Sequence, residues 1–479
     1  MTTIFTPLRD AMRQTGRAAV RFGRRLDTLS LELARDVGAV GRDAQALATA
    51  VHDQGSTLAR ATPRAAKLAQ VAASLVAHQR YLALRAAARG QAGLSDDDTR
   101  ALAQRATAAF AELRGGVVKL AQLASCRPDL VGAIWAAELA TLQSDVPAID
   151  AAAIRARIEA ELGGELATWF ADFDDVPLAA ASLAQVHAAR LHDGTAVVVK
   201  VQVPGIDATL AADLAALRTV ARTVGELPGV DLATLSAELG RALLLELDYV
   251  AEAEALRAFA TQIGPDVVVP RPIAHASSAR VLTMTRIDGE PLQRWLVRAT
   301  EAGDLVARDR LLAALVGEFA AQIWARGLVH ADPHPGNLMV TPGGRLGLID
   351  FGCVLTLDAA ERAGYARLVM ALLADDRDAA ATALAGLGFT ADDPAQLLEL
   401  ARTLTAPLRS ATDAAAPHDW DAAFRAQLGD AATLPGLHVP RSFVLLGRVL
   451  ATISGPLATY RPALDVARLV GPHLAAALR

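Results

Sequence analysis

The chain has 479 residues, of which 53% are hydrophobic but only 4% aromatic, and its 47 basic and 52 acidic side chains give a net charge of −5. This composition excludes intrinsic disorder and a collagen-like fibre, and the near balance of charge argues against a protein that binds nucleic acid. A membrane-spanning helix needs about 20 mostly apolar residues. The apolar stretches of this sequence are short or interrupted, so we expect no integral membrane protein.

The first 35 residues are predicted to form a basic amphipathic helix, with seven arginines against three acidic residues. Apolar residues from Phe5 to Leu33 recur at spacings of three and four, which places them on one face. Such a helix can lie on an anionic membrane surface; the alternative is a solvated arginine face on a helix packed against the rest of the protein. With only two cysteines and no disulfide framework, we expect a cytoplasmic protein whose contact with the inner face of the membrane, where it occurs, is peripheral.

The pattern of apolar residues predicts an α+β protein with a small sheet region between two large helical regions. Residues 60–175 are expected to be helical, and 183–203 to form a hairpin around the Asp193-Gly194 turn, with 177–182 as the loop before it. Further elements are expected as strands over 267–269, 281–285 and 346–349, a helix over 305–326, a loop with short strands over 328–340, and helices from Asp358 onward.

The strongest chemical signal is His-Ala-Asp-Pro-His-Pro-Gly-Asn over 330–337, followed by Asp-Phe-Gly over 350–352. Asp332 and Asn337 are five positions apart, as are the Asp and Asn of a kinase catalytic loop. A nucleotide triphosphate with Mg²⁺ needs oxygen ligands for the metal, which Asn337 and Asp350 can supply. A further carboxylate must orient or deprotonate the acceptor, and Asp332 is placed for that role.

Lys200 follows three valines in a strand-like run. Kinases place a lysine on such a strand against the α- and β-phosphates and pair it with a helix glutamate. A lysine on an ordinary strand more often faces solvent, but its position upstream of the catalytic loop favours the kinase interpretation. The segment from Met284 to Gly289 links a strand to a helix, where a kinase hinge contacts adenine, so Met284 is a candidate nucleotide contact.

These stretches resemble the UbiB/AarF family of atypical protein-kinase-like proteins, related to the mitochondrial coenzyme Q kinases. The similarity covers about residues 112–355. Besides the two stretches above, it rests on an alanine-rich stretch, a lysine strand and a Glu-x-Asp helix, over residues 177–187, 200–206 and 246–253. The resemblance implies a two-lobed protein-kinase-like fold with a helical N-terminal extension and a mostly helical C-terminal lobe.

The resemblance also implies residue roles. Lys200 would bind the nucleotide phosphates and pair with Glu252, Asp332 would be the catalytic aspartate, and an alanine-rich loop would lie over the phosphates. That loop consists of Ala179, Ala180, Ala181 and Ser182. Ordinary kinases use glycines there, so that backbone N–H groups can approach the phosphates. Alanine stiffens the loop, and in the family it accompanies altered nucleotide selectivity and suppressed protein-kinase activity.

The Lys-x-Gly-Gln motif of the family is present here as Lys119-Leu120-Ala121-Gln122. Lys119 and Gln122 are three apart and share one face of a helix. The resemblance implies that this extension crosses the place of a peptide substrate and meets Glu246 and Asp248 near the active site. The sequence departs from the family pattern by alanine for glycine at positions 121 and 184.

We therefore expect four segments: a helical N-terminal region over 1–110, a Lys-x-x-Gln extension over 111–175, a kinase-like N-lobe over 176–290 and a C-lobe with a helical tail over 291–479. The predicted function is an atypical kinase or ATPase that binds ATP or ADP with Mg²⁺. The resemblance implies a role in ubiquinone or other isoprenoid-lipid biosynthesis, with an isoprenoid lipid or quinone precursor as partner. The alternatives are a small-molecule phosphotransferase of the aminoglycoside or choline kinase type and a non-catalytic nucleotide-binding scaffold; the phosphoryl acceptor stays open.

Overall fold

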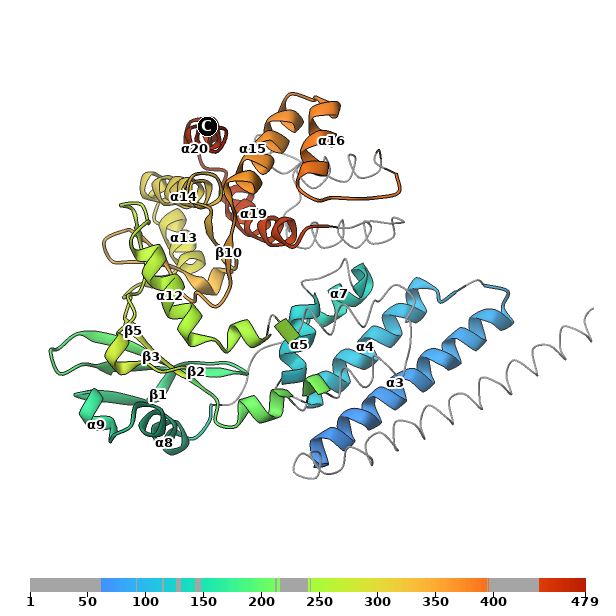
Figure 1. Ribbon diagram of the computed structural model, residues 1–479, viewed down its shortest axis with the longest axis horizontal. Coiled ribbons are helices and arrows are strands. Elements are labelled where there is room, and N and C mark those ends of the chain that lie inside the picture. The colour runs from blue at the N-terminus through green and yellow to red at the C-terminus, as the bar shows by residue number, and fades with distance from the viewer. Residues whose placement is uncertain are drawn as a thin grey trace, which may run out of the picture. The chain divides into compact units, whose positions relative to one another are not determined.

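The computed structural model describes residues 62–91, 93–113, 116–125, 131–142, 148–211, 213–215, 240–241, 243–393, 395 and 439–479. The predicted basic N-terminal helix lies outside these residues. The chain divides into two compact units, Met1–Ala109 with Ala212–Glu226, and Phe110–Ala211 with Leu227–Arg479. The second unit carries every residue that the sequence singles out for chemistry (Figure 1).

The first unit contains the long helix α3 (Thr62–Ala88) and most of α4 (Asp96–Leu113). Three acidic residues open α4, where the positive end of the helix dipole favours them. The two helices are joined by an ion pair between Arg85 and Asp98 and by a hydrogen bond of 3.2 Å that Arg105 donates to Ser74. Polar contacts therefore reinforce the packing of α3 on α4.

A four-stranded antiparallel sheet forms the N-terminal lobe of the second unit. Its order is β1 (Asp172–Ala180), β2 (Ala184–Arg190), β3 (Ala196–Gln202) and β5 (Val281–Thr285). The β2–β3 hairpin confirms the prediction, and the Asp193 carboxylate accepts a hydrogen bond from the Thr195 N–H at 2.8 Å in its turn.

The predictions for the region before the hairpin were partly wrong. Residues 172–175 were expected to be helical and 177–182 to be a loop, but β1 runs from Asp172 to Ala180 and pairs with β2. The strand tolerates Pro177 because it lies at the sheet edge, where the register shifts around the proline. Cross-strand pairing with β2 therefore prevails over the local preference of the sequence.

The alternation of side chains along β3 decides where Lys200 points. Val197, Val199 and Val201 are fully buried on one face of the sheet, against α8 (Ala151–Leu162) and α9 (Leu166–Trp169). Because successive side chains of a strand point to opposite faces, Lys200 projects from the other face. Helix α12 (Tyr249–Ala260) lies on that side and carries the lysine's partner.

The C-terminal lobe is mostly helical, and its core includes Leu312, Leu315 and Phe319. Its helices are α13 (Leu292–Glu301), α14 (Leu305–Ala320), the π-helix η2 (Ala321–Arg326), α15 (Ala359–Leu373), α16 (Arg377–Gly386), α19 (Arg441–Tyr460) and α20 (Val466–Ala477). The short strands β4 (Val267–Val268), β9 (Leu346–Leu348), β8 (Leu338–Val340) and β6 (Glu290–Pro291) form one sheet, and β7 (Leu328–His330) pairs with β10 (Val354–Thr356). The α+β, two-lobed architecture agrees with the prediction.

Among the described residues, α19 is the one helix long and apolar enough to meet the criterion for a membrane span. A core helix of a water-soluble protein can meet the same criterion. Here Val444 and Val449 are buried in the C-terminal lobe, and the hydroxyl groups of Ser442 and Tyr365 hydrogen-bond at 2.9 Å, joining α19 to α15. One face of α19 is thus part of the core.

Candidate active site

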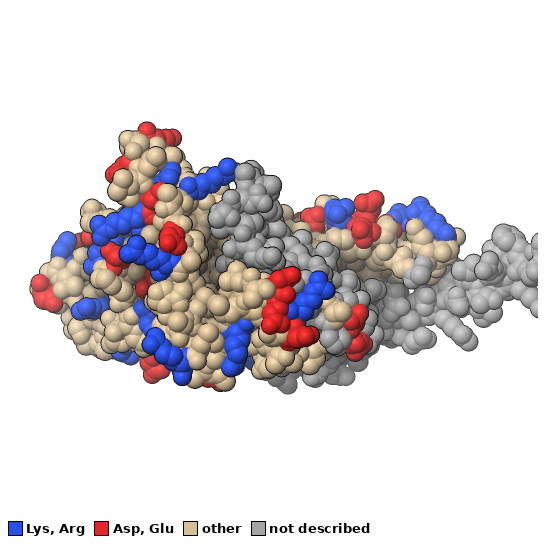
Figure 2. All heavy atoms as spheres, turned by 90° about the horizontal axis from the view of Figure 1, so that it is seen from above, with Lys and Arg blue, Asp and Glu red and all other residues tan. Residues whose placement is uncertain are grey.

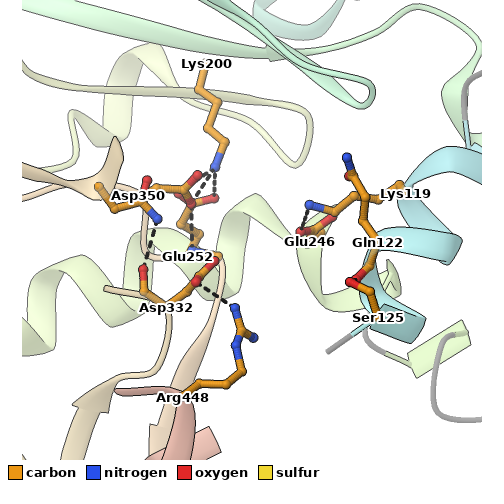
Figure 3. A network of polar contacts seen from close by, with 11 residues as sticks. Lys119, Gln122, Ser125, Lys200, Glu246, Glu252, Asp332, Asp350 and Arg448 are labelled. Atoms are coloured by element: carbon orange, nitrogen blue, oxygen red, sulfur yellow. Dashed lines mark hydrogen bonds and ion pairs between the residues drawn. The ribbon is translucent and has the colours of Figure 1, made fainter. Parts of the chain in front are cut away.

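Lys200 lies between two carboxylates that come from distant parts of the chain (Figure 3). Its Nζ donates to both oxygens of Glu252, at 2.8 and 2.9 Å, and to Oδ1 of Asp350 at 3.2 Å. The side chain of Glu252 is only 2% exposed, whereas that of Asp350 is 50% exposed. The cluster is therefore closed on the α12 side and open on the Asp350 side.

Helix α12 presents Glu252 to the lysine from its first turn. The Asp248 carboxylate caps the helix by accepting a hydrogen bond from the Ala251 N–H at 2.9 Å. The buried ring of Tyr249 lies under the ammonium group of Lys200, 5.2 Å from the ring centroid, which adds a cation–π contact. The cap and the ring together fix the lysine–glutamate pair.

The charges of this cluster shift its titration. Burial alone would lower the pKa of Lys200, but the charges of Asp350 and Glu252 raise that pKa well above its ordinary value. The positive charge of Lys200 lowers the pKa of Asp350 to about 2. Burial raises the pKa of Glu252, an effect that Lys200 opposes. At neutral pH the site thus presents a lysine cation beside an ionised, half-exposed Asp350.

Acid should remove the contribution of Asp350 to stability. Its pKa of about 2 lies below the ordinary 3.8, so the contribution is complete above the unfolded pKa and is lost as the pH falls towards the folded pKa. Between pH about 5 and pH about 2, the urea midpoint of the wild type should fall more steeply than that of Asp350→Asn. Parallel curves for the two proteins would contradict this assignment of charge.

The backbone around Asp350 is held in an unusual conformation. Asp350 has φ of +60°, in the left-handed region that non-glycine residues rarely adopt. Its Oδ1 accepts a hydrogen bond from the Gly352 N–H at 3.1 Å, and its carbonyl oxygen accepts one from Nε2 of His330 at 2.9 Å. Phe351 is buried between the rings of Phe259 and His330, each in edge-on contact. The packing of Phe351 therefore fixes the direction of the Asp350 carboxylate.

The loop over 330–337 lies beside this segment. The side-chain Nδ2 of Asn337 donates to the backbone carbonyl of Asp332 at 3.0 Å. The backbone carbonyl of Asn337 accepts a hydrogen bond from the Ile349 N–H at 3.0 Å. Because the amide nitrogen is used inside the loop, the side-chain oxygen of Asn337 is the atom left for a ligand. The loop and the strand before Asp350 are thus joined by hydrogen bonds.

A magnesium ion fits this donor set. Mg²⁺ in nucleotide sites is bound by one or two side-chain oxygens, waters and substrate phosphates, and Asn337 with the ionised Asp350 supplies such oxygens. Within the described ranges no group of three or more His, Cys, Asp and Glu side chains is arranged to hold a metal by itself. The arrangement suits a metal that arrives with a nucleotide.

A buried glutamine, Gln322, bonds to the first residue of the loop over 330–337. The side-chain oxygen of Gln322, in η2, accepts a hydrogen bond from the His330 N–H at 2.9 Å. Its amide nitrogen donates to Glu318 at 2.9 Å, and Arg326 donates to the same Glu318 oxygen at 2.7 Å. The sequence predicts one continuous helix over 305–326 and gives no sign that its last turn is a π-helix.

The remaining predicted nucleotide contacts lie on the N-terminal lobe. Ala179 and Ala180 end β1, while Ala181 and Ser182 form the turn before β2, which a hydrogen bond of 2.8 Å from the Ala181 N–H to the Ala184 carbonyl closes. Met284 lies in β5, opposite Val198 and buried, and β5 has the bounds 281–285 that the sequence predicts. Its contact with a nucleotide stays a prediction.

An ion pair joins the helical extension to the segment just before α12. Lys119, on α5 (Gly116–Ser125), pairs with Glu246 at 2.5 Å. Gln122 donates to the Leu142 carbonyl at 3.0 Å, in the segment after α7 (Ala133–Leu139), and Asp248 caps α12. The structure thus brings Lys119 and Glu246 together. Gln122 instead bonds to the Leu142 carbonyl, and Asp248 caps α12.

Sequence reasoning missed Arg448. This residue of α19 donates from Nη2 to Oδ1 of Asp332 at 2.8 Å, across 116 positions of sequence. The only local signal is an arginine within an otherwise apolar helix, which by itself predicts a solvent-facing residue.

A lysine on β3 paired with a glutamate of α12, together with an Asp–Asn loop and an Asp-Phe-Gly segment, defines a protein of the protein-kinase-like class. The family model described as the ABC1 atypical kinase-like domain matches residues 141–384. The chain belongs to this family, which is the UbiB/AarF family that its motifs resemble.

The curated relatives agree with this assignment. The chain is 39% identical over 242 residues to the uncharacterized protein sll1770 of Synechocystis, covering 49% of this chain and 41% of that protein. It is 36% identical over 290 residues to the chloroplastic protein ACTIVITY OF BC1 COMPLEX KINASE 3 of Arabidopsis thaliana, covering 59% and 40%. The chain thus spans about two fifths of the length of these relatives. A solved structure, the Rv3197–erythromycin complex from Mycobacterium tuberculosis, is 26% identical with a TM-score of 0.48, covering 74% of this chain and 93% of that one.

Proposed function

We propose that this chain is an atypical kinase or ATPase that binds ATP or ADP with Mg²⁺. The observation that carries the proposal is the convergence of Lys200, Glu252 and Asp350, with contacts of 2.8 to 3.2 Å, beside the Asp332–Asn337 loop. Charge of both signs is arranged there for a metal-bound polyphosphate. Membership of the ABC1 family supports the same conclusion.

Each residue has a distinct task in this proposal. Lys200, held by Glu252, binds the phosphates, and Asn337 and Asp350 provide oxygens for the metal. Bound Mg²⁺ neutralises the negative charge of the phosphates and orients them. Asp332 accepts the proton of an acceptor hydroxyl or of water while the γ-phosphorus forms a bond to that oxygen and breaks its bond to ADP.

The lipid role of the family extends the proposal to ubiquinone or other isoprenoid lipids as the partners that control turnover, with peripheral membrane contact by a cytoplasmic protein. We propose partners other than nucleic acid because the 47 basic and 52 acidic side chains nearly balance; on the one face that Figure 2 shows, basic and acidic side chains are intermixed. A surface that binds nucleic acid gathers basic residues instead.

The test is ATP turnover by the purified chain, with and without Mg²⁺ and with and without a detergent-solubilised quinone-like lipid. Asp350→Asn serves as the inactive reference. We expect turnover that requires Mg²⁺ and rises with the lipid. Nucleotide binding without turnover under any condition would favour a scaffold, and phosphorylation of added aminoglycoside or choline would favour a small-molecule phosphotransferase.

Lys119→Ala tests whether the extension restrains the active site. The Lys119–Glu246 pair is partly exposed, with both side chains 27% exposed, so its contribution is about 1 kcal/mol, or about fivefold in an equilibrium. We expect autophosphorylation, measured with labelled ATP, to rise by about that factor. An unchanged rate, with Lys67→Ala on α3 as the matched control, would count against the restraint.

A further inference from the structure

The carboxylate of Asp332 is already held by a cation from the C-terminal helix. Nη2 of Arg448 donates to Oδ1 of Asp332 at 2.8 Å. The two side chains are 24% and 37% exposed, so the pair is neither fully solvated nor sealed in the core. In the view of Figure 3, Arg448 reaches Asp332 from the side opposite Lys200.

Helix α19 holds Arg448 firmly. On either side of the arginine, Leu446 and Val449 are buried in the core of the C-terminal lobe. Near its start the helix is joined to α15 by the buried hydrogen bond between Ser442 and Tyr365. A side chain carried by such a helix is preorganised, so its contact with Asp332 costs little additional ordering.

The loop that carries Asp332 has no cation of its own. From Gly327 to Gly344 the sequence contains neither lysine nor arginine. Lys200 forms ion pairs with Glu252 and Asp350. Arg326 pairs with Glu318, which also accepts a hydrogen bond from Gln322. Arg448 therefore brings from another element the positive charge that this loop lacks.

We propose that Arg448 is a positioning residue for phosphoryl transfer, acting through Asp332; this rests on the proposed function. By holding Oδ1, Arg448 fixes the carboxylate and leaves Oδ2 to accept the proton of the acceptor hydroxyl or water. The acceptor oxygen then bonds to the γ-phosphorus, and ADP leaves with the electron pair of the broken phosphorus–oxygen bond. Without Arg448 the carboxylate turns freely, and the acceptor is less often aligned.

The experiment measures kcat and KM for Mg·ATP in the full chain for Arg448→Ala, Asp332→Asn and the double variant. A misplaced catalytic group costs up to about 100-fold in rate, so we expect Arg448→Ala to lower kcat by about 10- to 100-fold. KM should stay unchanged, because the arginine acts on Asp332 and not on the nucleotide. In the Asp332→Asn background, Arg448→Ala should cause no further loss, since the two residues act as a unit.

Two further measurements separate positioning from a merely structural role. Low, non-denaturing concentrations of guanidinium should restore part of the kcat of Arg448→Ala, because the ion can take the place of the lost side chain. Arg441→Ala removes an exposed arginine from the first turn of the same helix and should leave kcat unchanged. Alanine is a good helix former, so both variants are expected to fold.

Three results would overturn the inference: an unchanged kcat in Arg448→Ala, a change in KM alone, or an equal loss in the Asp332→Asn background. Each of them leaves the proposed function standing as long as the wild type turns over ATP. A wild type that binds Mg·ATP without turnover overturns the proposed function, and the inference with it.

Discussion

Replacing Asp350 by asparagine is expected to lower ATP turnover by about 100-fold or more. The carboxylate, with its pKa lowered to about 2 by Lys200, is ionised at any working pH. Asparagine keeps the shape and one oxygen but loses the charge. If Asp350 binds the metal as proposed, the affinity for Mg²⁺ and the balance of the charge of Lys200 should weaken together.

The measurement is turnover as a function of Mg²⁺ concentration. For Asp350→Asn the midpoint of the Mg²⁺ titration should move to higher concentration while the maximum falls. The matched control is Asp378→Asn, at an exposed aspartate of α16, which should behave as the wild type. An unchanged Mg²⁺ midpoint in Asp350→Asn would remove Asp350 from the metal site.

The second large effect concerns stability. Glu252→Ala leaves the ammonium group of Lys200, 12% exposed, with Asp350 as the carboxylate partner that the structure still gives it. Removing one partner of a buried ion pair costs about 3 to 5 kcal/mol. Since Asp350 keeps part of the charge balanced, we expect Glu252→Ala to lower the free energy of unfolding by about 3 kcal/mol. Urea unfolding measures the change.

A double variant separates stability from function. In Lys200→Met/Glu252→Met, apolar side chains of similar length replace both charges, so most of the stability lost in Glu252→Ala should return. Turnover should be abolished in this double variant, because the lysine proposed to bind the phosphates is gone. Asp266→Ala is the control, because its pair with Arg310 is exposed and contributes less than about 1 kcal/mol. A loss in Glu252→Ala no larger than in this control would show that the pair is not a structural element.

The local arrangement of the candidate site could be predicted from sequence because it depends on short stretches of the chain. The spacing of Asp332 and Asn337 is fixed by one loop, and the hairpin around Asp193 and Gly194 is fixed by one turn. Each is a local property in which backbone geometry follows from adjacent residues.

The rest depends on contacts between segments far apart in the chain. The residues of β1 do not by themselves predict a strand, because β1 forms by pairing with β2. Arg448 reaches Asp332 only once α19 has packed into the C-terminal lobe. The sequence pattern of a single segment does not predict such long-range packing.

The π-helix η2 after α14 limits which insertions and deletions the sequence can accept at this place. A π-turn holds one residue more than an α-turn, and that extra residue turns Gln322 so that it meets both Glu318 and the His330 N–H. Deleting one residue there is expected to restore the tighter winding and rotate Gln322 away. The buried N–H of His330, at the start of the loop over 330–337, then loses its acceptor. Insertions and deletions in this stretch are therefore expected to be selected against even where the side chains lost are plain alanines.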